Sequence, residues 1–314
     1  MLVSQPDAPN GPQAEPTVET AGPGSMEPAG PGSMEPAGRR EFDRSRALLA
    51  AAVATAVLAG TAAGSAHTLL AGVAAVQAAL IVAWVFGTAM PGRIGAMTIT
   101  GLAAAGADVA VTVWPNSALS PLLAPLGMGV LAMFVHQLMR GVVRARVVES
   151  LSGVAMVLVA AVGLTAYVQL RHELDGRSLA VAAILAAGTA VVIGQLVDLV
   201  WSRPRLDPEV PRGLVAIVLG CAAAAGAGAW VLRDSPVLSS GRALLLVAAV
   251  AVLAALVSVG ASFAAHGLTN QDVDAPSEFA VVHRPRPALR PLLVAIVPLS
   301  LVAPAAYVLF LRVG

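Results

Sequence analysis

Long apolar runs, separated by short polar stretches, cover the chain from residue 47 to its end. No Arg, Asp or Glu occurs between positions 47 and 92. One membrane crossing needs roughly 20 apolar residues, so this stretch predicts two helices. The same rule applied to the rest of the chain predicts about nine helices, at 47–65, 69–89, 94–114, 119–139, 148–169, 179–200, 213–232, 243–264 and 289–311.

The apolar runs predict helices and not strands. Backbone groups in lipid must form their hydrogen bonds within the protein, which an open sheet cannot do. The short alternating segments typical of a β-barrel are absent from the sequence. The fold class predicted is therefore all-α, a polytopic transmembrane helix bundle formed by residues 46–314.

The first 45 residues have a different character and predict a disordered tail. Residues 1–38 contain five acidic residues and no basic one, and are rich in Pro, Gly and Ala. The octapeptide AGPGSMEP occurs twice in tandem, at 21–28 and 29–36. Such a segment buries too little apolar surface to offset the entropy of ordering it.

Composition supports a membrane protein and excludes two other classes. Hydrophobic residues make up 57% of the chain and charged residues only 12%, with a net charge of +1. A soluble domain carries about 25% charged residues, and a nucleic-acid binder has a basic face. The expected partners are the lipid bilayer and other membrane proteins, with no nucleic acid.

The basic residues, all of which are Arg, predict the orientation. With the N-terminus inside, fourteen Arg fall on inner segments and five on outer segments. Positive charge is enriched on the cytoplasmic side of membrane proteins. We therefore expect a multi-pass protein of the cell membrane, with a cytoplasmic N-terminus and an outer C-terminus.

Few ionisable residues fall within the predicted helices, and these are candidates for function. Asp108 lies farthest from any Arg in sequence, while Asp198 has Gln195 one helical turn earlier on the same face. Asp108 or Asp198 could belong to a proton or cation path. Alternatively, Asp198, His136 and Glu149 pair with groups at the nearby Arg-bearing helix ends, and Asp108 makes a structural hydrogen bond.

Known catalytic patterns are absent from the sequence. It contains no GxSxG, HExxH or Walker loop, and its single Cys, Cys221, precludes an intramolecular disulfide. We predict no catalytic residue, no metal site and no cofactor. The remaining candidates for binding phosphate are clusters of Arg on the predicted cytoplasmic loops: Arg203, Arg205, Arg212, Arg284, Arg286 and Arg290.

Three stretches of the second half match sequence patterns of one enzyme family. Residues 206–213 read LDPEVPRG, and residues 303–307 read APAAY. Between them, Ser262 and Asp272 stand at the spacing of a third pattern, S-x-x-K-R-x4-K-D. In these stretches the chain resembles the CDP-diglyceride synthases (phosphatidate cytidylyltransferases), polytopic membrane enzymes that join CTP to phosphatidic acid with a divalent metal.

The chain departs from this family at the positions that carry its chemistry. The Lys positions of the family are occupied by Gly213, Ala265 and Gln271, and the chain contains no Lys. Only Ser262 and Asp272 match among the functional positions. The resemblance implies a degenerate relative that shares a scaffold over about residues 180–311, without the activity.

These observations favour a non-catalytic scaffold or a regulatory membrane component. The first alternative is a secondary transporter of a small solute or a lipid, which Asp108, Asp198 and the prolines of the last helix suggest. The second is a membrane-embedded transferase that binds phosphate through Arg alone.

Overall fold

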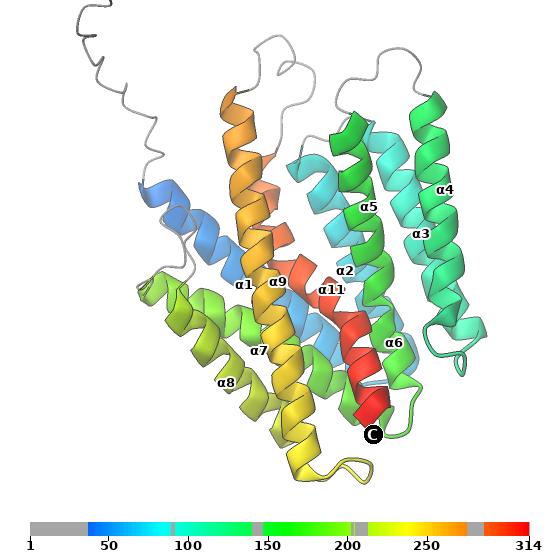
Figure 1. The fold of residues 1–314 in the computed structure, drawn as a ribbon, viewed down its shortest axis with the longest axis vertical. Helices are drawn as coiled ribbons and strands as arrows, with labels where there is room; N and C mark the ends of the chain where they lie inside the picture. Colours follow the sequence, from blue (N-terminus) through cyan, green and yellow to red (C-terminus); the bar gives the residue numbers. More distant parts are fainter. Residues whose placement is uncertain are drawn as a thin grey trace, which may run out of the picture. The chain divides into compact units, whose positions relative to one another are not determined.

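The computed structural model describes residues 37–88, 92–139, 147–201, 204, 213–274 and 286–313, with only the backbone at 37–42, 149, 266–274 and 313. Within these ranges it is an all-α bundle with nine helices long and apolar enough to cross a membrane (Figure 1). The predicted fold class is therefore confirmed. The tandem octapeptide lies outside the described residues.

The helices of the described residues follow one another along the chain. In chain order the elements are α1 (Ala37–Ala62), α2 (Ala66–Gly87), α3 (Arg93–Val113), η1 (Ser120–Leu122), α4 (Leu123–Met139), α5 (Val147–Leu164), α6 (Ala166–Arg171), α7 (Gly176–Val200), α8 (Leu214–Val231), α9 (Ser240–Asp274), η2 (Pro287–Leu289) and α11 (Arg290–Val313). The end of α2 and the start of α3 lie at what we call the Arg93 end of the bundle. The turn between α6 and α7 lies at the opposite end, the Glu173 end.

Three helices differ from their predicted limits by more than about four residues or are interrupted, while the others agree within that margin. Helix α1 begins at Ala37 and α9 continues to Asp274, both beyond the apolar run. A helix gains one hydrogen bond for each residue added, so it can extend into polar sequence. The third difference is a break: the predicted helix 148–169 is interrupted at Thr165, which separates α5 from α6.

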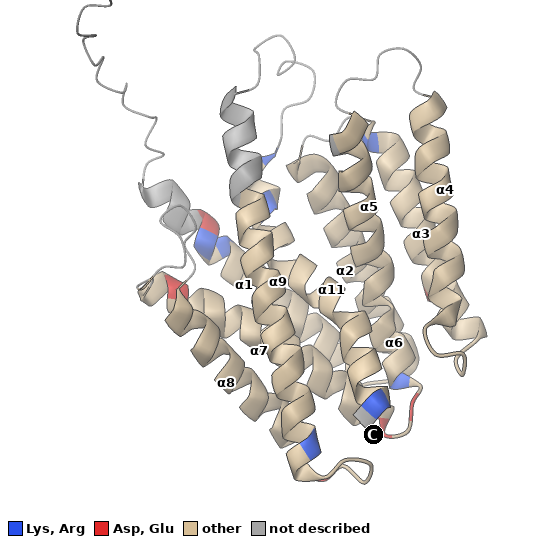
Figure 2. Ribbon diagram, in the orientation of Figure 1, with Lys and Arg blue, Asp and Glu red and all other residues tan. Residues whose placement is uncertain are grey.

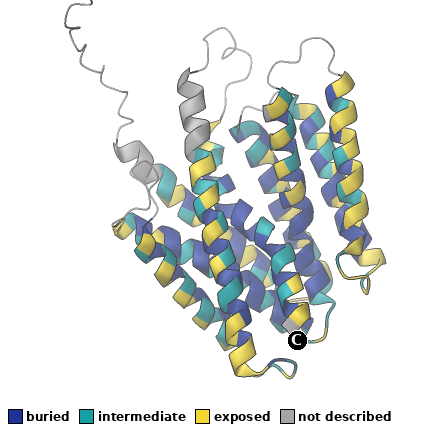
Figure 3. Ribbon diagram, viewed as in Figure 1, coloured by how far each residue is buried: buried dark blue, intermediate teal, exposed yellow. Residues whose placement is uncertain are grey.

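Helix α11 lies in the interior of the bundle. It packs against α9, α5, α2 and α7, and Figure 3 shows much of this helix as buried. Its Ile296, Leu299 and Ala303 are almost completely buried. Helices α7 and α8 form an extensive pair. Small residues allow this close contact: a Cβ at Gly220 of α8 would lie 2.7 Å from the carbonyl oxygen of Ala190.

A turn at residues 171–175 connects several elements at the Glu173 end. The Arg171 guanidinium donates to the carbonyl of Gly64, in the turn between α1 and α2, at 3.2 Å. Asp175 accepts hydrogen bonds from Ser178 of α7 at 2.7 Å and from Ser235, before α9, at 2.6 Å. Asp175 has φ = 54°, a left-handed conformation that Asp tolerates better than most residues. Figure 2 shows charged residues gathered near the helix ends.

Candidate functional site

Three polar side chains from separate segments meet inside the bundle. Gln77 belongs to α2, Asp108 to the second half of α3, and Thr165 to the break between α5 and α6. These helices are mutual neighbours, as Figure 1 shows. Gln77 is 2% exposed and Thr165 is fully buried, while Asp108 is half-buried. We call these three residues the Asp108 cluster.

A hydrogen-bond network connects the cluster. The Thr165 hydroxyl donates to Asp108 Oδ1 at 3.0 Å. Gln77 Nε2 lies within hydrogen-bond distance of the Thr165 hydroxyl at 3.0 Å, of the Ala161 carbonyl at 2.9 Å and of Asp108 Oδ1 at 3.3 Å. Two donors therefore converge on one carboxylate oxygen. Such donors stabilise the charged form of a carboxyl group removed from water.

The break at Thr165 coincides with a close contact with α11. A Cβ at Gly163 would lie 3.0 Å from the carbonyl oxygen of Ser300 and 3.4 Å from Pro304. Pro304 has no N–H to offer to the Ser300 carbonyl, four residues earlier in the same helix. The Thr165 N–H bonds to the Val162 carbonyl at 3.2 Å, three residues back, which is a tightened turn.

This arrangement can hold a proton or a small cation. The ionised Asp108 carboxylate can use the hydrogen bonds from Thr165 and Gln77, and a protonated carboxyl still has an oxygen that accepts them. An ionisable residue within a transmembrane helix is costly and marks ion and proton pathways. The Asp108 cluster is therefore the candidate site.

The structure gives Asp198 a different environment. Its Oδ1 accepts a hydrogen bond from the Gly213 N–H at 2.8 Å, so it holds the end of α7 to the start of α8. Neither amide atom of Gln195, which is 7% exposed, has a hydrogen-bond partner within the described parts. Asp198 and Gln195 lie near the end of α7 that leads into α8, and neither joins the Asp108 cluster.

Several other candidates have local contacts or lie outside the description. The Ser262 hydroxyl bonds to the Ser258 carbonyl in its own helix at 2.8 Å. The imidazole of His136 packs against Gly95 of α3. Arg286 and Arg290 are described, whereas Arg203, Arg205, Arg212, Arg284 and the side chains of Glu149 and Asp272 fall outside the described residues.

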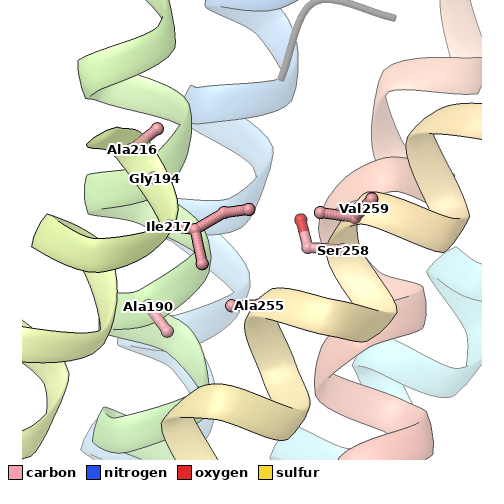
Figure 4. Close-up of a pocket in the computed structure, with 7 residues that line it drawn as sticks. All are labelled: Ala190, Gly194, Ala216, Ile217, Ala255, Ser258 and Val259. Carbon is pink, nitrogen blue, oxygen red and sulfur yellow. The ribbon is translucent and has the colours of Figure 1, made fainter. Parts of the chain in front are cut away.

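A pocket lies between α7, α8 and α9 (Figure 4). It is lined by small or aliphatic residues and one hydroxyl, namely Ala190, Gly194, Ala216, Ile217, Ala255, Ser258 and Val259. Among the described residues, no charged side chain contributes to its wall. Its chemistry suits neither a triphosphate nor a divalent metal, both of which need charged ligands.

The sequence indicated Asp108 but not its two partners. Gln77 and Thr165 carry no charge, and isolated uncharged polar residues are tolerated in apolar helices. The one indication in the sequence was that Gln77 places an amide side chain within a long apolar run. Its connection to Asp108 depends on which faces of α2, α3 and α5 meet.

The nine apolar helices of the described residues are consistent with a multi-pass membrane protein, and one of them carries the half-buried carboxyl group of Asp108. No protein-family model matches this chain, and no curated protein matches it.

Proposed function

We propose that the protein is a secondary transporter in which Asp108 binds and releases the coupling ion, a proton or a small cation. The observation that supports this proposal is the hydrogen bond from Thr165 to Asp108 at the break between α5 and α6. Transporters use interrupted helices in this way, because the break frees polar groups to face an ion inside the membrane.

The contacts around Asp108 suit an ion that is bound and then released. The Asp108 carboxyl is half-buried, whereas its partners Thr165 and Gln77 are buried almost completely. The partners thus provide a fixed frame, and the carboxyl is the most accessible member of the cluster. Gain or loss of a proton there changes the charge of the site without requiring new partners.

A scaffold or regulatory role is a second proposal, and a different observation favours it. At Gly220, helices α7 and α8 lie too close together for a Cβ atom, and the pocket beside them is small and apolar. A closely packed pair of this kind favours a rigid body over one that alternates between two shapes. In a scaffold the Asp108 cluster would be a structural hydrogen-bond network.

An experiment with sealed vesicles separates the two proposals. The purified protein is reconstituted into liposomes that contain a pH-sensitive dye, and a potassium gradient with valinomycin imposes an inward-driving potential. We expect vesicles with the wild-type protein to acidify faster than empty ones. Asp108→Asn should abolish this difference. Asp234→Asn, which changes an exposed carboxyl paired with Arg233, should retain it.

Folding of the variants is checked by size-exclusion chromatography and thermal unfolding in detergent. An Asp108→Asn protein that folds and conducts protons like the wild type would overturn the transport proposal. Sodium entry is measured in the same vesicles, and wild-type vesicles that take up neither protons nor sodium faster than empty ones would overturn the proposal as well.

A further inference from the structure

One nitrogen atom of the Asp108 cluster lies among three oxygen atoms. Gln77 Nε2 is 2.9 Å from the Ala161 carbonyl oxygen, 3.0 Å from the Thr165 hydroxyl and 3.3 Å from Asp108 Oδ1. A carboxamide nitrogen carries two N–H groups and therefore cannot donate to three acceptors at once. The position of Nε2 thus has one oxygen more than an amide can use, whereas a cation at this position would contact all three.

The break between α5 and α6 supplies one of these oxygens. In a regular α-helix the Ala161 carbonyl accepts a hydrogen bond from the N–H group four residues later. Here the Thr165 N–H donates to the Val162 carbonyl at 3.2 Å, so the Ala161 carbonyl loses its usual partner and accepts from Gln77. Backbone carbonyls at interrupted helices bind ions in transporters, and the C-terminal end of a helix, such as α5 here, attracts positive charge.

The charge of the cluster matches a monovalent cation. Among the described residues, the hydrogen-bond partners of Asp108 are Thr165 and Gln77, and both are neutral. An ionised carboxyl without a counter-charge is costly at membrane depth. One positive charge neutralises it, whereas a divalent ion would leave one positive charge in excess.

The chemistry of the oxygens selects sodium over potassium. Carboxylate, hydroxyl and carbonyl oxygens are ligands of hard cations, and an ionised carboxylate exerts a stronger field than a carbonyl. A strong field favours the smaller ion, because its charge approaches the oxygens more closely. Asp108 is half-buried while Thr165 is fully buried, so an ion reaches the site past the carboxyl.

We propose that Asp108, Thr165 and the Ala161 carbonyl bind a sodium ion in place of Gln77 Nε2. Gln77 then turns its carboxamide so that Oε1 faces the ion as a fourth ligand. The Thr165 hydroxyl continues to donate to Asp108 and offers a lone pair to the ion. As a statement about the coupling ion this inference rests on the proposed function, and a proton competes with sodium for the same carboxylate.

Sodium binding is measured on the purified full-length protein in detergent, without an ion gradient. Isothermal titration calorimetry gives the affinity, and thermal unfolding at constant ionic strength gives the stabilisation. We expect sodium chloride to raise the melting temperature, and potassium chloride and choline chloride to leave it unchanged. An equal shift with choline chloride would overturn the proposal, and an equal shift with potassium chloride would overturn the assignment to sodium.

Two threonine variants provide a matched pair. Thr165 and Thr100 are both fully buried, but the Thr100 hydroxyl donates to the Ala96 carbonyl of its own helix, α3, at 2.7 Å. Removal of one oxygen that contacts the ion should weaken binding about tenfold or more, so Thr165→Val should show this loss and Thr100→Val should not. Asp108→Asn should abolish sodium binding. Equal affinities for Thr165→Val and Thr100→Val would overturn the proposal.

A measurement on the wild-type protein guards against variants that fail to fold. Dicyclohexylcarbodiimide modifies protonated carboxyl groups in apolar surroundings, and peptide mass mapping reports the extent of reaction at Asp108. Sodium chloride should slow this reaction several-fold, and choline chloride should not. An unchanged rate in sodium chloride would contradict a sodium ion at this carboxylate.

The outcomes separate the sodium site from the proposed function. Proton entry into vesicles that requires Asp108, together with no sodium binding, would refute the sodium site and leave transport standing. Sodium binding without entry of either ion would refute transport and leave the site.

Discussion

The hydroxyl of Tyr307 in α11 donates a hydrogen bond to Glu173 Oε1 at 2.7 Å, and this bond joins the last helix to the turn between α6 and α7. Tyr307 is 1% exposed. Removing its hydroxyl by Tyr307→Phe should lower the free energy of unfolding by about 1–3 kcal/mol, because the hydrogen bond is made to a charged group. Thermal unfolding in detergent checks this. Glu173→Gln keeps an acceptor oxygen and should cost less, so a larger loss for that variant would contradict the prediction.

Two glycines of α8 should respond oppositely to the same substitution. A Cβ at Gly220 would lie 2.7 Å from the Ala190 carbonyl oxygen and 3.2 Å from the Gly194 nitrogen, whereas a Cβ at Gly226 would meet nothing within 4 Å. Gly220→Ala should destabilise the protein by about 1–3 kcal/mol, because backbone atoms of α7 must move. Gly226→Ala should be neutral or should stabilise by up to about 1 kcal/mol. An equal fall in melting temperature for Gly220→Ala and Gly226→Ala would refute the close contact between α7 and α8.

Replacing Thr165 by Val removes the hydroxyl and keeps the shape of the side chain. Asp108 then loses one donor and Gln77 loses one acceptor. We expect Thr165→Val to lower the free energy of unfolding by about 1–3 kcal/mol, since buried polar groups lose their partner. If Asp108 binds the coupling ion, the variant should also slow proton entry into vesicles. Thr165→Ser restores the hydroxyl and should recover both properties.

His172, in the turn that follows α6, should make stability depend on pH. Burial lowers the pKa of its imidazole below the usual 6.5, and the charge of Arg171 adds to this effect. The unfolded chain therefore binds a proton at a higher pH than the folded protein does. The contribution of His172 to stability is present above its unfolded pKa and is lost as pH falls from about 6.5 through the lowered, folded pKa.

Melting temperatures of the wild type and of His172→Gln, measured between about pH 8 and pH 5, test this prediction. The wild type should lose more stability on acidification than His172→Gln does. The buried Nδ1 of His172 has no partner among the described residues, which adds to the cost of placing a proton there. Parallel pH profiles for the two proteins would contradict the prediction.

The odd number of spans and the Arg distribution predict that the two termini lie on opposite sides of the membrane. Alkaline phosphatase fused to the C-terminus should be active, because this enzyme works only outside the cytoplasm. A fluorescent protein at the same position should be dark when exported in unfolded form. The opposite pair of results would place the C-terminus inside and would contradict the assignment of fourteen Arg to inner segments.

Most of the helical architecture could be predicted because it depends on local sequence. The sixth and seventh helices were expected at 179–200 and 213–232, and α7 and α8 cover Gly176–Val200 and Leu214–Val231. Polar residues and turn formers end each apolar run, which limits the helices in lipid. The extension of α9 to Asp274 was missed because helix continuation requires no hydrophobicity.

The candidate site could be predicted only in part. Asp108 was identified because a carboxyl in an apolar helix is rare, a property visible without a fold. Asp198 met the same criterion, yet it bonds to the backbone of Gly213 and connects two helices. The distance of Asp108 from any Arg favoured it over Asp198, but sequence alone could not show which groups each carboxyl faces.

The amino-acid sequence determined the all-α fold class, the approximate limits of the nine apolar helices found among the described residues and the rarity of Asp108, because hydrophobicity and charge act residue by residue along the chain. Tertiary packing determined the partners of Asp108 and the contact of Gln77 with the Ala161 carbonyl. These contacts join segments far apart in sequence. They depend on the rotation and depth of each helix, which are set by contacts between helices such as that of Gly220 with Ala190 and not by any one helix alone.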